Sequence, residues 1–548
     1  MRKKAIKEVK IEKVKYPNIS QGYDENGKVI EFKGGVLGQT VKIKTTKRGK
    51  DKIKAKYLDL IEHSDLENNT NTCSNPDICG GCAYQRLAYE TELMLKVDMI
   101  KKMFEENGIN YQGDIKINQS PKTKAYRNKM EYTFGDREKG GELVLGLHRQ
   151  NRFYEIVGTN DCNIVDNDFN IIRSNVENYF RDKKTDFYHK STNEGLLRHL
   201  IVRKAHRTGE LMVILVTTSD TSFDEIRKNL FLNKLLDSKV EGKIVSVFHV
   251  INDSVADAVI PQKISLIYGK DHIVEEMLGL NFKISPFSFF QPNIYTAEKL
   301  YQKAFDLASI DGQMDVLDLY SGTGTITQVM ATKAKSATGI EIVKEAVDKA
   351  WENAALNDIK NIDFLCGDVL EEIEKVGNKY DVVILDPPRA GISSNSLEKI
   401  LKIDTKKFIY ISCNPKTQVE NIKEFTSSGY KIKDYELFDQ FPRSRHVETV
   451  ALLSKLDVDK HISVEIELDE MDLTSAESKA TYAQIKEYVW NKFQLKVPTL
   501  YIAQIKRKCG IELREHYNKS KKEKQIIPQC TPEKEEAIMD ALRHFKMI

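Results

Sequence analysis

The segment IYISCNP, residues 409–415, places a thiol where an apolar strand should end. Cys413 follows a β-branched run and precedes Asn414-Pro415, which stops a strand. A free cysteine inside a strand packs as a small hydrophobic residue. At the carboxyl end of a strand in an open α/β sheet, it faces the crevice where ligands bind. Cys413 alone is compatible with either packing or chemistry, so the other residues of the site are needed to distinguish the two roles.

Polar residues also follow the preceding apolar runs. DVLDLYSGTGTIT leads into a turn at Gly322 and Gly324, where the backbone can approach a ligand closely. Glu341 ends TGIE, 17 residues after Gly324, where an acid can bind both ribose hydroxyls. Asp368 and Asp386 end the next two strands. These strand ends converge on one crevice, so they predict a nucleoside site.

The glycine turn narrows the class of cofactor. No Gly-x-x-x-x-Gly-Lys-Ser/Thr cradle is present, which disfavours a nucleoside triphosphate, and the incomplete G-x-G-x-x-G disfavours a dinucleotide. The pattern is similar to that of S-adenosyl-L-methionine methyltransferases, whose cofactor has a nucleoside but no phosphates. Similar enzymes that methylate amino groups have an aromatic residue after Pro-Pro. Arg389 stands there, which disfavours an exocyclic amine as the acceptor.

Carbon 5 of a pyrimidine is too weak a nucleophile to accept a methyl group directly. A thiolate that adds to carbon 6 activates it, and a base must then remove the carbon-5 proton. Cys413 fits the nucleophile, and Glu448 in FPRSRHVETVALL is the candidate base. Arg443, Arg445 and His446 lie close by in sequence and could hold the thiolate or phosphates.

Residues 1 to about 456 resemble the RNA uracil-5 methyltransferase family, in its form with an N-terminal TRAM domain and an iron–sulfur cluster. The matching segments, in chain order, are CSNPDICGGC, YRNKMEYTFG, GLHRQN, GTNDCNIV, FFQPN, LDLYSGTGTIT, DPPRAG, ISCNP and RHVETV. The resemblance implies Cys413 as nucleophile and Glu448 as base. It implies cofactor contacts from Gln291, Tyr320, Glu341, Asp386 and Asp368. The chain departs from the family at Pro292, which leaves Gln291 available.

Four cysteines form a candidate metal site. Cys73, Cys79 and Cys82 lie together and Cys162 follows after a long gap, which is enough for a [4Fe–4S] cluster or a tetrahedral zinc. The spacing does not choose between them, but the family resemblance favours [4Fe–4S]. The radical spacing C-x3-C-x2-C is absent, so we expect a structural cluster that keeps the central domain in shape for RNA.

The elements that must position these residues predict an α/β protein. Strands alternate with helices at βαβ spacing from residue 285 to 456, as in the doubly wound sheet of a class I methyltransferase. We expect a TRAM/OB-like β-barrel over 1–62 and an α+β iron–sulfur central domain over 63–284. Residues 457–548 predict a helical extension outside the family resemblance.

Composition limits the partners. The net charge is only +3, but VKIKTTKRGKDKIKAKYLDLIEHS is strongly basic, as a solvated strand face or as a phosphate-binding patch. No segment approaches the ~18 apolar residues of a membrane span, and no signal peptide is visible. We expect a cytoplasmic monomer that binds RNA.

The resemblance also bears on the substrate. Family forms with both TRAM domain and cluster mostly modify 23S rRNA, whereas tRNA-specific relatives often lack both, so 23S rRNA is favoured and tRNA stays open. Tyr126 and Arg127 are candidates for base stacking and phosphate binding. A non-catalytic RNA-binding or chaperone protein is a further alternative, which the intact Cys413, Glu448 and glycine turn disfavour.

The extension has two interpretations. Apolar residues recur at helical spacing on both sides of Val497-Pro498, and capping signals stand at Thr474 and at Thr531-Pro532. The extension is either a helical appendage that packs on the methyltransferase or an RNA-docking module that uses Lys506, Arg507 and Lys508. Cys509 and Cys530 have no partners at metal-ligand spacing.

Overall fold

The structure is a computed structural model, and it describes residues 5–68, 73–376, 380–455, 482–509, 530–545 and 547. The chain divides into two compact units, residues 1–458 and residues 459–548. Each unit is described by itself.

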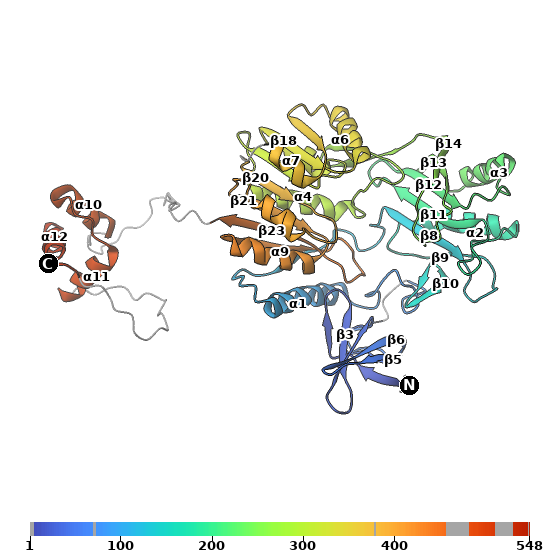
Figure 1. The fold of residues 1–548 in the computed structure, drawn as a ribbon, viewed down its shortest axis with the longest axis horizontal. Helices are drawn as coiled ribbons and strands as arrows, with labels where there is room; N and C mark the ends of the chain where they lie inside the picture. The colour runs from blue at the N-terminus through green and yellow to red at the C-terminus, as the bar shows by residue number, and fades with distance from the viewer. Residues whose placement is uncertain are drawn as a thin grey trace, which may run out of the picture. The chain divides into compact units, whose positions relative to one another are not determined.

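An N-terminal β half-barrel opens the first unit (Figure 1). Its sheet has the order β1-β5-β6-β4-β3-β2. The strands are β1 (Ile6–Lys10), β2 (Lys13–Lys15), β3 (Ile19–Tyr23), β4 (Val29–Lys33), β5 (Thr40–Arg48) and β6 (Lys52–Glu62). Along β5 the apolar Val41 and Ile43 are buried, while Lys42 and Lys44 alternate with them on the other face. The basic stretch is therefore the outer face of this sheet.

A second sheet follows, in the order β10-β9-β8-β11-β12-β13-β14. Its strands are β8 (Lys129–Gly135), β9 (Val144–Arg149), β10 (Arg152–Gly158), β11 (Leu197–Lys204), β12 (Glu210–Thr217), β13 (Lys243–Ile251) and β14 (Lys263–Gly269). Its helices α2 (Asn167–Asp182) and α3 (Glu225–Leu236) share an apolar core with the sheet. The hairpin of β15 (Ile273–Met277) and β16 (Leu280–Ile284) ends this part of the chain.

The third sheet has the order β19-β18-β17-β20-β21-β23-β22-β7. Its strands are β17 (Asp315–Leu319), β18 (Ser336–Glu341), β19 (Ile362–Cys366), β20 (Val382–Leu385), β21 (Lys407–Ser412), β22 (Tyr430–Phe438), β23 (Glu448–Lys455) and β7 (Lys116–Asn118). Strands β17 to β21 pair in parallel, whereas β23 is antiparallel to both neighbours. The predicted doubly wound α/β sheet is confirmed.

Helices cover both faces of this sheet. One face packs against α4 (Ile294–Ala308), α5 (Thr325–Ala331) and α6 (Lys344–Leu356). The opposite face packs against α1 (Tyr89–Asn107), α7 (Val369–Val376), α8 (Ser394–Ile400) and α9 (Pro415–Ser427). Helix α1 and strand β7 lie within the range predicted for the central domain. However, β7 is a strand of this third sheet and α1 packs on it.

The second unit contains α10 (Tyr482–Phe493), α11 (Thr499–Lys508) and α12 (Pro532–His544) around a small core of its own. Helix α12 begins at Pro532 after the N-cap Thr531, as predicted. The capping signal at Thr474 lies outside the described residues. Of the helices that the structure describes, none has the length and apolar character needed to cross a membrane.

Candidate active site

Strand register brings Cys413 and Glu448 together. In the antiparallel pairing of β21 with β23, Ser412 lies opposite Thr449. The next positions along the same pairing are Cys413 and Glu448. Directly opposed residues of antiparallel strands have Cβ atoms roughly 4.5–5.5 Å apart. The reversed direction of β23 therefore brings a carboxyl group beside the thiol at the end of β21.

The Asn-Pro sequence after Cys413 has a structural role on both sides. Pro415 is the first residue of α9, where its missing N–H leaves no bond unmade. The side-chain amide of Asn414 donates to the carbonyl oxygen of Arg389 at 2.9 Å. Cys413 thus lies at the N-terminal end of a helix, whose dipole favours a thiolate, and beside the loop that follows β20.

One cavity of about 870 Å³ adjoins these residues. Its lining includes, among the residues predicted for the site, Gln291, Tyr320, Gly322, Glu341, Asp386, Cys413 and Glu448. Gly324 and Asp368 do not line it. Gly324 is the N-cap of α5, where its positive φ of 72° and the closeness of Phe364 both require glycine. Asp368 accepts from the N–H of Leu370 at the start of α7.

The glycine turn is held by the acid at the end of the next strand. The N–H of Gly322 donates to Glu341 at 3.0 Å, and the N–H of Val343 donates to the other carboxylate oxygen at 2.9 Å. Tyr320, at the end of β17, has a left-handed φ of 68°, a strained conformation for a bulky residue. The cavity edge is therefore a preformed backbone turn with a carboxylate beside it.

Burial and charge set the protonation of the acidic groups. Burial, followed by the charges of Glu448 and Asp386, raises the pKa of the Cys413 thiol to about 12, and Arg389 opposes this rise. Burial, with Asp386 nearby, raises the pKa of Glu448 well above its usual value. Burial raises the pKa of Asp386 to about 7. A positive charge in the cavity would lower all three pKa values.

A buried ionic cluster anchors the loop that precedes Glu448. Lys96 of α1 lies 2.7 Å from Glu92 and 2.6 Å from Asp439, and all three side chains are fully buried. Glu92 also accepts from the N–H of Arg443 at 2.7 Å. Gln440 donates to the side-chain oxygen of Gln291 at 3.0 Å. The 439–446 loop is thereby tied both to α1 and to the segment before α4.

Some residues predicted to contact RNA or the thiolate have other contacts in the structure. Tyr126 is buried and its hydroxyl donates to the carbonyl oxygen of Pro442 at 2.8 Å, so it supports the loop rather than stacking on a base. Arg127 lines the cavity. The guanidinium of Arg445 is buried and donates to Asn18 and to the carbonyl oxygen of Gly35 in the half-barrel.

Three residues near the reacting groups were not predicted. Tyr16 of the half-barrel is buried within electrostatic reach of Glu448 and Cys413, and burial raises its pKa. Phe289 lines the cavity with 66% of its surface exposed, and Tyr301 lines it from α4. Phe289 stands in the FFQPN segment two residues before Gln291, so this aromatic pair was a usable signal. Nothing in the sequence pattern links Tyr16 to a site formed more than 350 residues later.

The four predicted cysteine ligands line one small cavity in the first unit, with Gln85 and Asp161 among its other walls. Among the described residues, no three His, Cys, Asp or Glu side chains are arranged to hold a metal ion. Two N–H groups point at the sulfurs, from Gly81 to Cys79 at 3.4 Å and from the Gln85 side chain to Cys82 at 3.3 Å. The four thiols around this cavity are the type of donor that a [4Fe–4S] cluster or a zinc ion uses, although the described side chains are not arranged to hold one.

The glycines of CGGC have a packing role. A Cβ on Gly80 would lie 2.8 Å from the carbonyl oxygen of His148, and one on Gly81 would lie 2.9 Å from Leu147. Both contacts are with β9, to which the cysteine loop is bonded. The residues after Cys82 then donate two N–H bonds, from Ala83 at 2.8 Å and Tyr84 at 3.0 Å, to the carbonyl oxygen of Arg443. The cysteine loop therefore contacts the loop that precedes Glu448.

Comparison with known proteins places the chain in a family. The sequence profile described as tRNA (uracil-5-)-methyltransferase matches residues 88–456. An uncharacterized RNA methyltransferase of Caldanaerobacter subterraneus subsp. tengcongensis is 43% identical over 458 residues, which are 83% of this chain and 100% of that protein. One of Clostridium tetani is 41% identical over 457 residues, which are 83% of this chain and 99% of that protein.

A solved structure has the same fold. The tRNA (uracil-54, C5)-methyltransferase of Pyrococcus abyssi, crystallised with S-adenosyl-L-homocysteine, superposes with a TM-score of 0.64 at 24% identity. The match covers 81% of this chain and 99% of that one. The expected methyltransferase fold and family are both confirmed: the chain belongs to the RNA uracil-5 methyltransferase family.

Proposed function

We propose that this protein transfers a methyl group from S-adenosyl-L-methionine to carbon 5 of a uridine in RNA. The observation that carries the proposal is that Cys413 and Glu448 both line one large cavity, each one position beyond the last pair of β21 and β23 and within electrostatic reach of each other. A nucleophile and a base on one side of a nucleoside-sized cavity are what this reaction needs.

The chain's own residues account for the chemistry in balanced steps. The Cys413 thiolate adds to carbon 6, and the electron pair of the 5,6 double bond moves toward the carbonyl at carbon 4. That electron pair then returns through carbon 5, which forms a new bond to the methyl group that S-adenosyl-L-methionine, when bound, supplies from its sulfonium; the carbon–sulfur bond that breaks leaves its electron pair on sulfur. Glu448 then takes the proton from carbon 5. The C–H electron pair restores the double bond and expels the Cys413 thiolate.

The cofactor is proposed to lie along the glycine turn. Glu341 can accept from ribose hydroxyls with the lone pairs that remain after its two backbone bonds. Gln291, Tyr320, Gly322 and Asp386 line the same cavity and are proposed as further contacts. Asp368 and Gly324 lie outside the lining. Asp368 is within electrostatic reach of Tyr320, and Gly324 acts through the shape of the turn.

The target base has to leave its stack to reach Cys413. Unstacking costs a few kcal/mol, which exposed aromatic side chains can offset by stacking on the extruded base. Phe289, exposed at the cavity, is the side chain placed to do so.

We propose 23S rRNA as the substrate. The N-terminal half-barrel with its outward lysines and the four-cysteine cavity together support this assignment, since the resembling family forms with both parts mostly modify that RNA. A tRNA is the second candidate, which is favoured by the description of the family profile and by the name of the Pyrococcus abyssi enzyme.

We further propose that Cys73, Cys79, Cys82 and Cys162 hold a [4Fe–4S] cluster with a structural role. The bonds from Ala83 and Tyr84 to Arg443 support this role, because they join the cysteine loop to the loop before Glu448. Protein purified without oxygen should contain iron and acid-labile sulfide in equal amounts, and Cys162→Ser should lose both. Stoichiometric zinc without iron would contradict the cluster.

The activity is tested on RNA from cells that lack the gene. Mass spectrometry of their separated rRNA and tRNA should show which 5-methyluridine is missing, and the wild-type protein should restore it in vitro. Cys413→Ala should abolish the transfer while cofactor affinity stays within a few-fold, because the thiol acts only on the base. Turnover by Cys413→Ala above about one hundredth of wild type would contradict the assigned nucleophile.

A further inference from the structure

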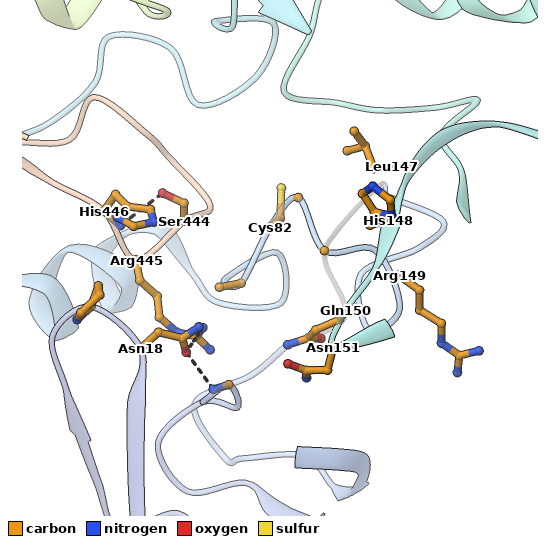
Figure 2. Close-up of a pocket in the computed structure, with 15 residues that line it drawn as sticks. Asn18, Cys82, Leu147, His148, Arg149, Gln150, Asn151, Ser444, Arg445 and His446 are labelled. Atoms are coloured by element: carbon orange, nitrogen blue, oxygen red, sulfur yellow. Dashed lines mark hydrogen bonds between the residues drawn. The ribbon is translucent and has the colours of Figure 1, made fainter. Parts of the chain in front are cut away.

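A second cavity, of about 500 Å³, opens beside the proposed active site. The two cavities share Gly81, Ser444 and His446 in their linings. Figure 2 shows the second cavity between the half-barrel, the cysteine loop, the turn that joins β9 to β10, and the loop before Glu448. Its volume is in the range of cavities that bind small organic groups. The proposed reaction assigns it no role.

Three side-chain amides contribute to the polar wall of this cavity. Gln150 and Asn151 project into it from the β9–β10 turn, and Asn18 faces them from the half-barrel (Figure 2). Asn18 uses its side-chain oxygen to accept from the N–H of Gly34 at 2.9 Å and from Arg445. Gln150 and Asn151 make no side-chain hydrogen bond with any residue that the structure describes.

The turn that carries the two amides is well fixed. The backbone N–H of Gln150 donates to the carbonyl oxygen of Ile78 at 2.8 Å, so the turn is bonded to the cysteine loop. Asn151 has a left-handed φ of 61°, which asparagine tolerates. The amide groups therefore have a stable backbone beneath them, although their own donors and acceptors are unused.

The arginines and His148 at this cavity already have partners. Arg149 extends away from the cavity in Figure 2 and pairs with Glu155 at 3.0 Å. His148 lies 3.1 Å from Asp257. Arg445 donates to Asn18 and to a backbone carbonyl. A phosphate bound here would therefore contact side chains that already have partners. The edge of a nucleobase would contact amides whose donors and acceptors are still available.

Amides suit base edges because each carries a donor and an acceptor side by side. An asparagine or glutamine can bind a base through both groups at once. Sequence-specific recognition of RNA uses unstacked bases in this way. His446, which lies between the two cavities, has its pKa lowered to about 4 by burial and by Arg389, so its ring is neutral at neutral pH. His446 therefore places no charge where the two cavities adjoin.

We propose that the second cavity holds the unpaired base of the nucleotide next to the target uridine, and that Gln150 and Asn151 bind its edge. The inference rests on the proposed function, since it needs the target uridine in the first cavity. It assigns a sequence-reading role to the β9–β10 turn, while the chemistry stays with Cys413 and Glu448.

The test uses an RNA oligonucleotide around the uridine that mass spectrometry identifies. The nucleotide on either side of that uridine is replaced, one at a time, by an abasic residue. With wild-type enzyme, one of the two replacements should raise KM about ten- to hundredfold and leave kcat unchanged. The double variant Gln150→Ala/Asn151→Gly should show the raised KM with the intact RNA and no further rise with the abasic one. Glycine keeps the left-handed conformation at residue 151.

Arg152→Ala is the matched control, because Arg152 lies on the same hairpin, is exposed and does not line the cavity. It should keep the wild-type response to both abasic RNAs. If wild-type enzyme is indifferent to both neighbours, or if the double variant still distinguishes intact from abasic RNA, the second cavity does not read a base. Failure of the wild-type enzyme to methylate any RNA would instead refute the proposed function, and this inference with it.

Discussion

Cys413 and Glu448 are both hard to ionise in the free protein. Burial raises the pKa of each; the charges of Glu448 and Asp386 raise the pKa of Cys413 further, and the charge of Asp386 raises that of Glu448 further. Arg389 is the nearby group that opposes these shifts. A bound sulfonium adds a second positive charge, which favours the thiolate and the carboxylate. Cofactor binding should therefore favour the ionised forms of both residues. Without the cofactor, the Cys413 thiol should react more slowly.

The reactivity of Cys413 should respond in opposite directions to its charged neighbours. Asp386→Asn removes a negative charge and should speed alkylation of Cys413 by iodoacetamide. This effect should grow above about pH 7, because burial raises the pKa of Asp386 to about 7 and its charge is complete only above that value. Arg389→Gln removes a positive charge and should slow alkylation. Mass spectrometry of the Cys413 peptide at several pH values measures both rates.

The exposed Cys366 is an internal control for these measurements, since its alkylation should be the same in all three proteins. Equal Cys413 rates in wild type and both variants would show that Asp386 and Arg389 do not control the thiol.

Glu448→Gln should separate methyl transfer from product release. Glutamine cannot take the carbon-5 proton, so the thiolate cannot be expelled after the methyl group has been added. A covalent RNA–protein adduct that carries the methyl group should therefore accumulate on denaturing gels. Free 5-methyluridine formed at the wild-type rate, with no adduct, would mean that another residue is the base.

Sequence alone identified Cys413 because it follows an apolar strand, whereas Glu448 came from the need for a base and from the family resemblance. Asp368 follows a strand in the same way, but its side chain caps α7 instead of lining the cavity. Tyr16 reaches the site from the half-barrel, and no local pattern encodes a contact made by packing between distant segments. Strand ends identify candidates, and tertiary packing decides which of them meet.

At the scale of elements, the 439–446 loop joins α1, the cysteine loop and the segment before α4. Its main anchor is Lys96, whose ammonium lies between Glu92 and Asp439 with no exposure to solvent. Tyr89 adds a hydrogen bond to Asp439 at 2.8 Å. Removing the Lys96 ammonium leaves Asp439 without its cation and leaves Glu92 only the longer contact to Arg443, at 3.5 Å, so the loop depends mainly on Lys96.

Lys96→Met should lower the free energy of unfolding by about 3–5 kcal/mol, the usual cost of removing one partner from a buried ion pair. Lys101→Met is the matched control on the same helix. Its pairing with Asp114, at 3.4 Å, is exposed, so its loss should cost about 0–1 kcal/mol. Urea unfolding followed by circular dichroism measures both. A Lys96→Met protein as stable as Lys101→Met would show that the buried cluster is not an anchor.

The alternation of strands and helices after residue 285 was predictable, because parallel strands are apolar runs separated by amphipathic helices. The addition of β7 to that sheet was not. A strand of only three residues, Lys116–Asn118, carries no periodicity, and it pairs with β22 more than 300 residues away. The packing of α1 on this sheet was not predictable either.

At the scale of the whole molecule, the family profile ends at residue 456 and the second compact unit begins at residue 459. That unit has a core of its own, formed by side chains such as Ile485, Ile502 and Ile538. Its proposed phosphate-binding residues are not equivalent. Lys506 is only 6% exposed and lies over the Tyr482 ring at 4.5 Å, whereas Arg507 and Lys508 are exposed.

Deleting residues 457–548 should leave the methyltransferase folded and its turnover at saturating RNA unchanged, because the proposed catalytic residues and the apolar cores around them belong to the first unit. If the second unit docks on RNA, the deletion should raise the Kd for RNA and lower the salt dependence of binding by roughly one slope unit per lost phosphate contact.

Arg507→Ala/Lys508→Ala in the full chain should reproduce part of that loss of RNA binding. Lys506→Ala should not, since a lysine packed on an aromatic ring is not free to contact a phosphate. Binding titrations at several salt concentrations measure all three proteins. An unchanged Kd and slope after deletion would exclude RNA docking by this unit, and an equal loss in Lys506→Ala would show that packing, not charge, explains the effect.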